Sequence, residues 1–259
     1  MKKLIIKQIA RYKKKFLYKR NASRIEYGKA CNEGITIIYR ISDAGYKKLK
    51  PDYINNENCL ANAVSAFPTA EYNWLVIADN CCDQTLTMIQ KYIPVDKIRS
   101  VSVGHGAGTF NLAYDFALGL PDDEVVYFLE NDYLHTPDAA KILTEGFAID
   151  TNGYFTLYDH PDKYYIKENS VLYFTENSHW KETSSTTMTL AARVKTLKKD
   201  EKVWRKWTTG THPYDWQIFL ELKYFQKRKC YSSIPACSTH GEVKWLSPLI
   251  DWEKVALQR

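Results

Sequence analysis

Short apolar segments alternate with segments of helical periodicity over the first half of the chain, and this alternation restricts the fold more than any other feature. Buried strands are indicated by β-branched and aromatic content at 34–39, 74–78, 98–103 and 124–129. Helical patterns separate them at 58–67, 84–92 and 109–118. Strands that alternate with helices form parallel sheets built from βαβ units. The pattern therefore predicts an α/β fold with a mostly parallel central sheet flanked by helices.

The second half of the chain is less regular but contains no repeat or linker. Helices are expected at 137–147, 188–197 and 213–225, strands at 153–158, 170–175 and 230–237, and an irregular tail over the last twenty residues. A chain of 259 residues can bury a sizeable core without disulfides or structural metals. We therefore expect a single domain over residues 31–259, preceded by a separate segment over residues 1–30.

The N-terminal segment carries the excess positive charge of the chain. Residues 1–20 contain nine of the 36 Lys and Arg and no acid, which leaves 27 basic residues against 30 acidic ones in the rest. Ile5, Ile9, Tyr12 and Phe16 form an apolar stripe at helical spacing among the lysines. Such a helix either lies on an anionic membrane surface or packs on the body of the protein. The slightly acidic body offers no broad cationic groove, so no nucleic-acid partner is expected.

The location of the protein follows from features that the sequence lacks. No stretch approaches the roughly 20 apolar residues that span a bilayer, and lysines interrupt the N-terminal apolar residues where a signal peptide would be continuous. Six cysteines are scattered without zinc-like spacing. We expect reduced thiols and a cytoplasmic protein, with membrane-surface contact through residues 1–20 as one alternative.

Polar residues follow three of the predicted strands where each strand ends. Arg40 follows the first strand, Asp79 the second, and Glu130, Asn131 and Asp132 the fourth. Ligands of open parallel sheets bind at the carboxyl ends of the strands. An acid at such a place can also cap the next helix or turn, which is the simpler interpretation for Asp83 but a weaker one for the segment 130–132.

The segment 130–132 is the strongest candidate for chemistry. Two carboxylates follow the most apolar strand of the chain, where a buried charge is costly unless a cation or a hydrogen-bond donor compensates it. A hard divalent cation, held by one or two carboxylates and completed by diphosphate oxygens and water, fits this arrangement.

The order of three segments resembles glycosyltransferase family 2 and related enzymes of the GT-A fold. These segments are 76–83, 104–113 and 126–132, which match the family's acidic turn, its glycine-containing helix start and its Asp-X-Asp motif. The resemblance implies a GT-A fold in which residues 31–135 bind a nucleotide sugar and residues 136–259 bind the acceptor. Two departures are Ala78, in place of the first acid of the turn, and Glu130, in place of the first Asp of the motif.

The resemblance also implies roles for individual residues. The donor site would contain Arg40, Asp79, Gly106, Glu130 and Asn131. Asp132 and His240 would bind Mn²⁺ or Mg²⁺, and an imidazole ligand favours Mn²⁺. For His240 a purely structural role is the alternative, and for the loop around Gly106 the alternative is a turn that only needs small residues.

The acceptor side of the site rests on one acid and two aromatic residues. Asp215 corresponds to the family's general base at the start of a helix, although the same position favours an acid through the helix dipole alone. Trp180 and Trp216 are candidates for stacking on an acceptor sugar, with core packing as the alternative.

The predicted function is inverting, metal-dependent transfer of a sugar from a nucleotide-diphosphate donor, most simply a UDP-sugar, to a glycan or lipid-linked acceptor. One alternative is a non-catalytic sugar- or nucleotide-binding module on the same fold, which the departures at Ala78 and Glu130 favour. The other is a nucleotidyltransferase, which would need a basic, glycine-rich segment after the first strand that this chain does not have.

Overall fold

The computed structural model describes residues 8, 34–44, 48–165 and 170–257. The chain divides into two units, Met1–Asn32 and Glu33–Arg259, and the account below concerns the second. The segment predicted at residues 1–30, apart from Gln8, lies outside the described residues. No described helix combines the length and the apolar character that crossing a membrane requires.

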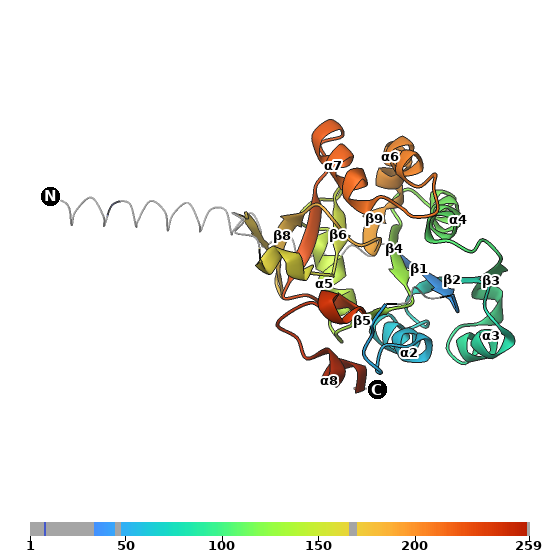
Figure 1. Cartoon of the computed structure of the whole chain (residues 1–259). Coiled ribbons are helices and arrows are strands. Elements are labelled where there is room, and N and C mark those ends of the chain that lie inside the picture. Colours follow the sequence, from blue (N-terminus) through green and yellow to red (C-terminus); the bar gives the residue numbers. More distant parts are fainter. Residues whose placement is uncertain (1–7, 9–33, 45–47, 166–169, 258–259) are drawn as a thin grey trace. The chain divides into compact units, whose positions relative to one another are not determined.

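Nine strands of the described residues form one sheet, in the order β3-β2-β1-β4-β9-β6-β10-β8-β7 (Figure 1). Their bounds are Ile35–Ser42 (β1), Asn73–Asp79 (β2), Ile98–Val101 (β3), Val125–Glu130 (β4), Tyr154–Thr156 (β6), Leu172–Phe174 (β7), His179–Thr183 (β8), Leu190–Arg193 (β9) and Cys230–Ile234 (β10). β9 and β8 run against the common direction of the other strands. The predicted α/β fold with a mostly parallel central sheet is confirmed.

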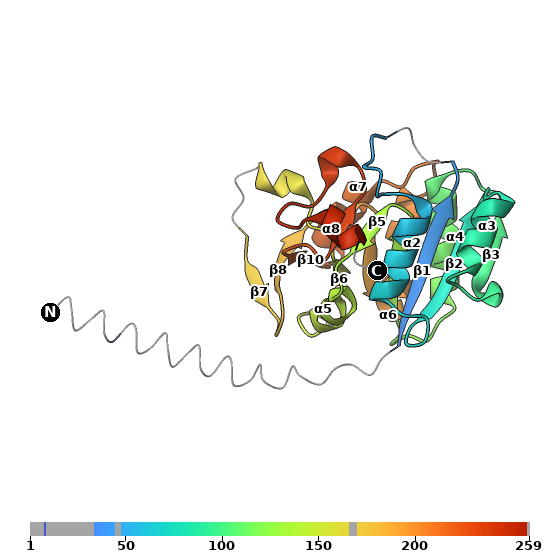
Figure 2. The same ribbon diagram turned by 90° about the horizontal axis from the view of Figure 1, so that it is seen from below.

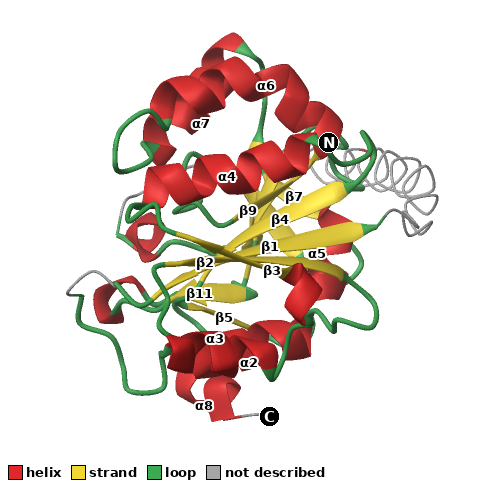
Figure 3. Ribbon diagram, turned by 90° about the vertical axis from the view of Figure 1, so that its right-hand side faces the viewer, coloured by secondary structure: helices red, strands yellow, loops and turns green. Residues whose placement is uncertain are grey.

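Helices cover both faces of this sheet (Figure 3). Their bounds are Asn56–Ala66 (α2), Asp83–Gln90 (α3), Gly106–Leu118 (α4), Ala139–Gly146 (α5), Val194–Trp207 (α6), Asp215–Phe225 (α7) and Trp252–Leu257 (α8). The helices α4, α6 and α7 lie on one face, and α2, α3 and α8 lie on the other (Figure 3).

Alternation of side chains along the central strands explains the two layers. Tyr127 and Leu129 of β4 enter the core under α2 and α5, whereas Val126 and Phe128 enter the core under α4 and α6. A strand whose side chains are buried on both faces reads as a continuous apolar run, which is how β4 appears in the sequence. This central position places the residues that follow β4 at the middle of the carboxyl edge.

Two expectations for the second half were wrong. The segment predicted as a helix at 188–197 contains β9 and only the start of α6, because Leu190–Arg193 is buried between β4 and β6, and a short apolar run has no period that separates a strand from a buried helix. The predicted irregular tail contains α8, which packs beside α2 (Figure 2).

A small second sheet was not predicted. The short strands Tyr133–His135 (β5) and Ser238–His240 (β11) pair in antiparallel fashion, with His240 opposite Tyr133. Leu134, Ile54 and Trp252 form a separate apolar cluster beside this sheet. The pairing brings the late residue His240 next to the segment that follows β4.

Acid sensitivity is expected from His135, which is 1% exposed. Burial lowers the pKa of His135 to about 3. The unfolded chain, with a pKa near 6.5, therefore binds a proton that the folded state rejects, and stability falls as the pH drops below about 6.5. Between pH 7 and pH 5 this residue should reduce the free energy of unfolding by about 2 kcal/mol.

Urea unfolding at the two pH values measures this effect in the wild type, in His135→Gln and in the exposed control His179→Gln. The difference between the two pH values should shrink by about 2 kcal/mol in His135→Gln alone. An unchanged difference in that variant would show that His135 is not the acid-sensitive group.

Candidate functional site

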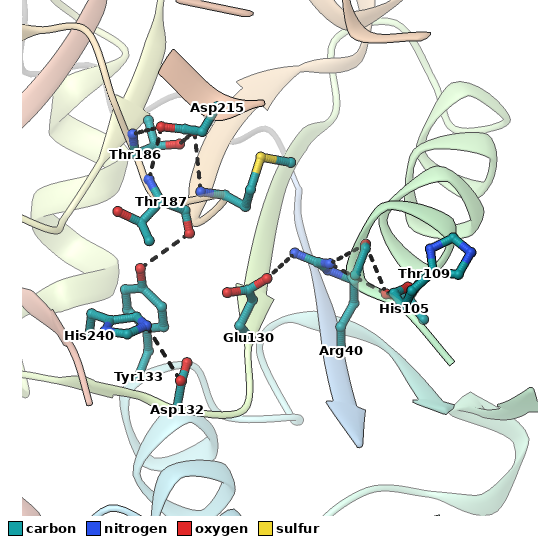
Figure 4. Close-up of polar contacts among 12 residues, drawn as sticks. Arg40, His105, Thr109, Glu130, Asp132, Tyr133, Thr186, Thr187, Asp215 and His240 are labelled. Carbon is teal, nitrogen blue, oxygen red and sulfur yellow. Dashed lines mark hydrogen bonds and ion pairs between the residues drawn. The ribbon is translucent and has the colours of Figure 1, made fainter. Parts of the chain in front are cut away.

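A partly buried ion pair links the carboxyl ends of β1 and β4. Arg40, 5% exposed, extends from β1 and places Nη2 2.8 Å from Oε1 of Glu130, the last residue of β4 (Figure 4). Its Nη1 donates to the carbonyl oxygen of Gly106 at 3.2 Å, and its guanidinium lies over the ring of Phe110, 5.3 Å from the centroid. Arg40 therefore links β1, β4 and the start of α4. The predicted donor-site residues Arg40, Gly106 and Glu130 meet at one place.

Asp132 and His240 meet on the other side of Glu130 (Figure 4). Nε2 of His240 lies 3.4 Å from Oδ2 of Asp132, and Nζ of Lys50 lies 3.0 Å from the same oxygen. Both acidic and imidazole groups are largely buried, with the side chain of Asp132 13% exposed. The structure therefore brings together the two residues that the sequence resemblance proposes as metal ligands.

The surroundings of this pair set its protonation. Burial raises the pKa of Asp132, but His240 and Lys50 outweigh burial and hold that pKa below its usual range. Burial lowers the pKa of His240, against the opposing pull of Asp132. At neutral pH a charged carboxylate therefore faces a neutral imidazole, and these are the forms in which the two groups bind metals.

The donor set fits a divalent cation that also binds a substrate. Oδ1 of Asp132 is buried and has no hydrogen-bond partner, which is costly for an ionised oxygen unless a cation binds there. Within the described part of the chain, no cluster of three or more His, Cys, Asp or Glu could hold a metal ion. Two protein ligands suit a cation whose shell is completed by phosphate oxygens and water.

Asp79 and Asn131, the other two predicted donor-site residues, hold neighbouring loops. The Asp79 carboxylate accepts hydrogen bonds from the amides of Val103 (2.7 Å) and Gly104 (2.9 Å). Nδ2 of Asn131 donates to Oδ1 of Asn56 at 2.6 Å. The same Nδ2 of Asn131 donates to the carbonyl oxygen of Ser42 at 3.3 Å, so both side chains hold backbone at the carboxyl edge of the sheet.

Two glycines around the start of α4 occupy positions that disfavour a side chain. Gly104 adopts a φ of +80°, which favours glycine. A Cβ on Gly108 would collide with Val103. Gly104 and Gly108 therefore have steric reasons to be glycine, whereas a Cβ on Gly106 would meet only Pro213, at 3.9 Å. His105 caps the helix, since its Nδ1 accepts a hydrogen bond from the amide of Gly108 at 3.0 Å.

Asp215 lies at the N-terminus of α7 and anchors the loop 185–188. Its oxygens accept from the amides of Thr186 (2.8 Å), Thr187 (3.2 Å) and Met188 (3.3 Å), and from the hydroxyls of Ser185 (2.6 Å) and Thr186 (2.7 Å) (Figure 4). Thr187 and Met188 have φ values of 50° and 60°. Left-handed backbone is strained for a β-branched residue, so these bonds hold a loop that would otherwise relax.

This loop also contacts the side of the site that contains His240. The hydroxyl of Tyr133 donates to the carbonyl oxygen of Thr187 at 3.3 Å, and the ring of Tyr133 packs against that of His240 with centroids 5.4 Å apart. Asp215 is therefore connected to His240 through Thr187 and Tyr133 (Figure 4).

The two predicted acceptor residues are in different environments. Trp180 is 0% exposed and packs edge-on against Phe155 in the core, where it cannot contact a sugar. The prediction for Trp180 does not fit this position, because aromatic residues are also efficient core-packing units. Trp216 is 57% exposed on α7, beside Asp215.

Sequence reasoning missed Lys50 and Tyr133. Tyr133 directly follows the acidic segment 130–132 and could have been singled out on that ground. Lys50 lies in a long polar segment whose sequence gives no sign that one of its lysines reaches Asp132.

The backbone at Gly241 is packed tightly against the site. A Cβ at Gly241 would lie 2.8 Å from the carbonyl oxygen of Asp132 and would collide with Ile54. Gly241→Ala should therefore lower the free energy of unfolding by about 1–3 kcal/mol through overpacking. Chemical denaturation measures the change, with Gly210→Ala as a matched control because no atom lies within 4 Å of its added Cβ. Equal stability of the two variants would contradict this prediction.

Comparison with known proteins supports the fold and no more. No family model matches the sequence, and no curated protein matches it in sequence. TarS of S. aureus, solved as residues 1–349, has a TM-score of 0.51 at 16% identity, covering 79% of this chain and 59% of that chain. GalNAc-T7, solved with UDP, GalNAc and Mn²⁺, has a TM-score of 0.52 at 8% identity, covering 79% of this chain and 42% of that chain.

The structure of a cytidylyltransferase also matches. The 2-C-methyl-D-erythritol 4-phosphate cytidylyltransferase of Francisella tularensis has a TM-score of 0.47 at 11% identity, covering 86% of this chain and 97% of that chain. The present chain spans less than two thirds of the TarS and GalNAc-T7 structures. Together with the strand order and the helices on both faces, the matches to TarS and GalNAc-T7 show that this chain has the GT-A fold.

Proposed function

We propose that this protein is a metal-dependent glycosyltransferase that moves a sugar from a nucleotide-diphosphate donor, preferably a UDP-sugar, to an acceptor hydroxyl with inversion. The observation that carries the proposal is the convergence of Asp132 and His240 at the carboxyl edge of the sheet, where Oδ1 of Asp132 is buried without a partner. Ligands of open α/β sheets bind at this edge.

The residues of the site then have distinct tasks. Asp132 and His240 would hold Mn²⁺ or Mg²⁺, which when bound neutralises charge on the leaving diphosphate. Arg40 and Glu130 keep the ends of β1 and β4 together beside this position. Asp79 holds the loop before α4, and Asn131 holds the end of β1 and the start of α2, where the nucleoside would rest.

Asp215 is proposed as the base that receives the proton of the acceptor hydroxyl. Three backbone amides hold its carboxylate in place. The hydroxyl of Ser185, a partly exposed residue, donates to Oδ2 and can rotate away without disturbing those amides. An acceptor hydroxyl that takes the place of this donor would lie within hydrogen-bond distance of the base, as proton transfer requires.

The acceptor is proposed to be a glycan or a lipid-linked glycan. Trp216 is exposed next to Asp215, and the C–H face of a sugar can stack on an indole ring. A lipid-linked acceptor would fit a basic N-terminal segment that lies on a membrane surface.

Thermal unfolding with a panel of nucleoside diphosphates, each with and without Mn²⁺, tests the proposal. A ligand present at 100 times its Kd adds about 2.7 kcal/mol to the free energy of unfolding. One nucleotide should therefore raise the Tm by roughly 5–10 °C in the presence of Mn²⁺. No shift with any nucleotide, for a folded sample, would contradict the proposal and leave a shared fold only.

A further inference from the structure

Lys50 occupies a position in the candidate site that the proposed function does not use. It lies in the loop between β1 and α2, and its Nζ is 3.0 Å from Oδ2 of Asp132, the same oxygen that faces His240. The side chains of Lys50 and Asp132 are both partly buried, with 26% and 13% of their surface exposed. A positive charge of the chain itself therefore already neutralises the carboxylate proposed to bind the metal.

The other acid of the segment has a different kind of partner. Glu130 pairs with Arg40, a buried strand residue that also contacts Gly106 and the ring of Phe110. Lys50 instead reaches Asp132 from a loop, on a flexible side chain that carries a compact, rotatable ammonium. Of the two ion pairs, the Lys50–Asp132 pair is therefore the one that can exchange partners without disturbing the sheet.

A neighbouring lysine provides a built-in comparison. Lys48 lies in the same loop, and its Nζ is 3.3 Å from Oε2 of Glu242. Lys48 carries the same charge as Lys50 and lies in the same loop, but its ion pair is with Glu242 and not with Asp132. The contact with Asp132 is thus a property of Lys50 and not of the basic loop as a whole.

We propose, on the basis of the proposed function, that Lys50 is a built-in counter-ion that leaves Asp132 when a divalent cation binds and then pairs with the diphosphate of the donor. A cation bound to Asp132 repels the nearby ammonium, which needs another anion in this sheltered place. A nucleoside diphosphate supplies that anion. Metal and nucleotide therefore bind cooperatively. The diphosphate gives the displaced ammonium of Lys50 a new anion, and the metal frees that ammonium from Asp132 so that it can pair with the diphosphate.

Titration with Mn²⁺ alone and with Mn²⁺ in the presence of UDP, followed by the electron paramagnetic resonance of free Mn²⁺ and corrected for Mn²⁺ bound to UDP in solution, tests this proposal. In the wild type the nucleotide should tighten Mn²⁺ binding at least about 10-fold. In Lys50→Met, Mn²⁺ alone should bind about 10-fold more tightly than in the wild type, and the tightening by nucleotide should shrink by the same factor. Lys50→Arg, which keeps the charge, should behave as the wild type does. Lys48→Met removes a charge whose ion pair is with Glu242, so its gain in Mn²⁺ affinity should be clearly smaller than that of Lys50→Met.

The outcomes separate the two proposals. Equal Mn²⁺ affinities in the wild type and Lys50→Met, with circular dichroism showing both folded, would overturn the role of Lys50 and leave the proposed function intact. An equal gain in Lys48→Met would also overturn it, because the effect would then belong to the net charge of the loop. Absence of Mn²⁺ binding in every variant, with or without nucleotide, would overturn both proposals.

Discussion

Asp132→Asn is expected to abolish the Mn²⁺-dependent stabilisation by nucleotide and to lower sugar transfer roughly a thousand-fold, equivalent to about 4 kcal/mol of transition-state stabilisation. Asparagine keeps the size of the side chain but removes the charge, so a divalent cation loses its anionic protein ligand. The same change removes the negative charge that Lys50 and His240 both face. Thermal unfolding and a transfer assay with the stabilising nucleotide measure the two effects.

The matched control for this variant is Asp52→Asn. Asp52 is an exposed acid two residues from Lys50, so its substitution changes the net charge of the protein by the same amount without touching the site. It should leave the nucleotide-dependent rise in Tm within about 1 °C of the wild-type value. If Asp132→Asn keeps a Mn²⁺-dependent rise, Asp132 is not the metal ligand and the proposed donor site is wrong.

Asp215→Asn is expected to lower transfer about 10²- to 10⁴-fold while leaving the Mn²⁺-dependent binding of nucleotide unchanged. An amide cannot take up the acceptor proton. The side chain also presents an NH₂ group toward backbone amides that now donate to a carboxylate, which should reduce the free energy of unfolding by about 1–3 kcal/mol. The assay is therefore run well below the Tm of the variant.

A second substitution separates proton transfer from loop anchoring. Ser185→Ala removes the exchangeable donor to Oδ2 and keeps the three amide bonds to Asp215. This variant should retain transfer within about three-fold and lose no more than about 1 kcal/mol of stability. Transfer by Asp215→Asn at close to the wild-type rate would exclude Asp215 as the base and leave it as the residue that positions the loop 185–188.

The order of the elements along the chain and the apolar runs predicted two features of the tertiary structure. The apolar run of β4 predicted a central strand because a strand buried on both faces has no polar side chains to interrupt it. The acidic segment 130–132 was correctly placed at the carboxyl edge of the sheet, because it stands at the carboxyl end of this strand. His240 could be matched only through the family resemblance, since nothing local to residues 238–240 predicts that this strand pairs with β5.

Other predictions failed where local pattern is ambiguous. Residues 190–193 form a strand because they pair with β4 on one side and with β6 on the other, and a four-residue apolar segment contains no period that reveals this. Trp180 was proposed for the acceptor and lies in the core, since an aromatic side chain suits both places and only its neighbours decide between them.

Local periodicity and the geometry of βαβ units were enough to predict the α/β class, the order of the parallel strands along the chain and the edge at which polar side chains gather. The pairing of the charges at that edge could be read from the three-dimensional arrangement alone. Arg40 and Glu130 are separated by 90 residues, and Asp132 takes its partners from a loop after β1 and from β11 near the end of the chain. A buried charge must find its partner in space, and such pairing leaves no periodic trace in the sequence.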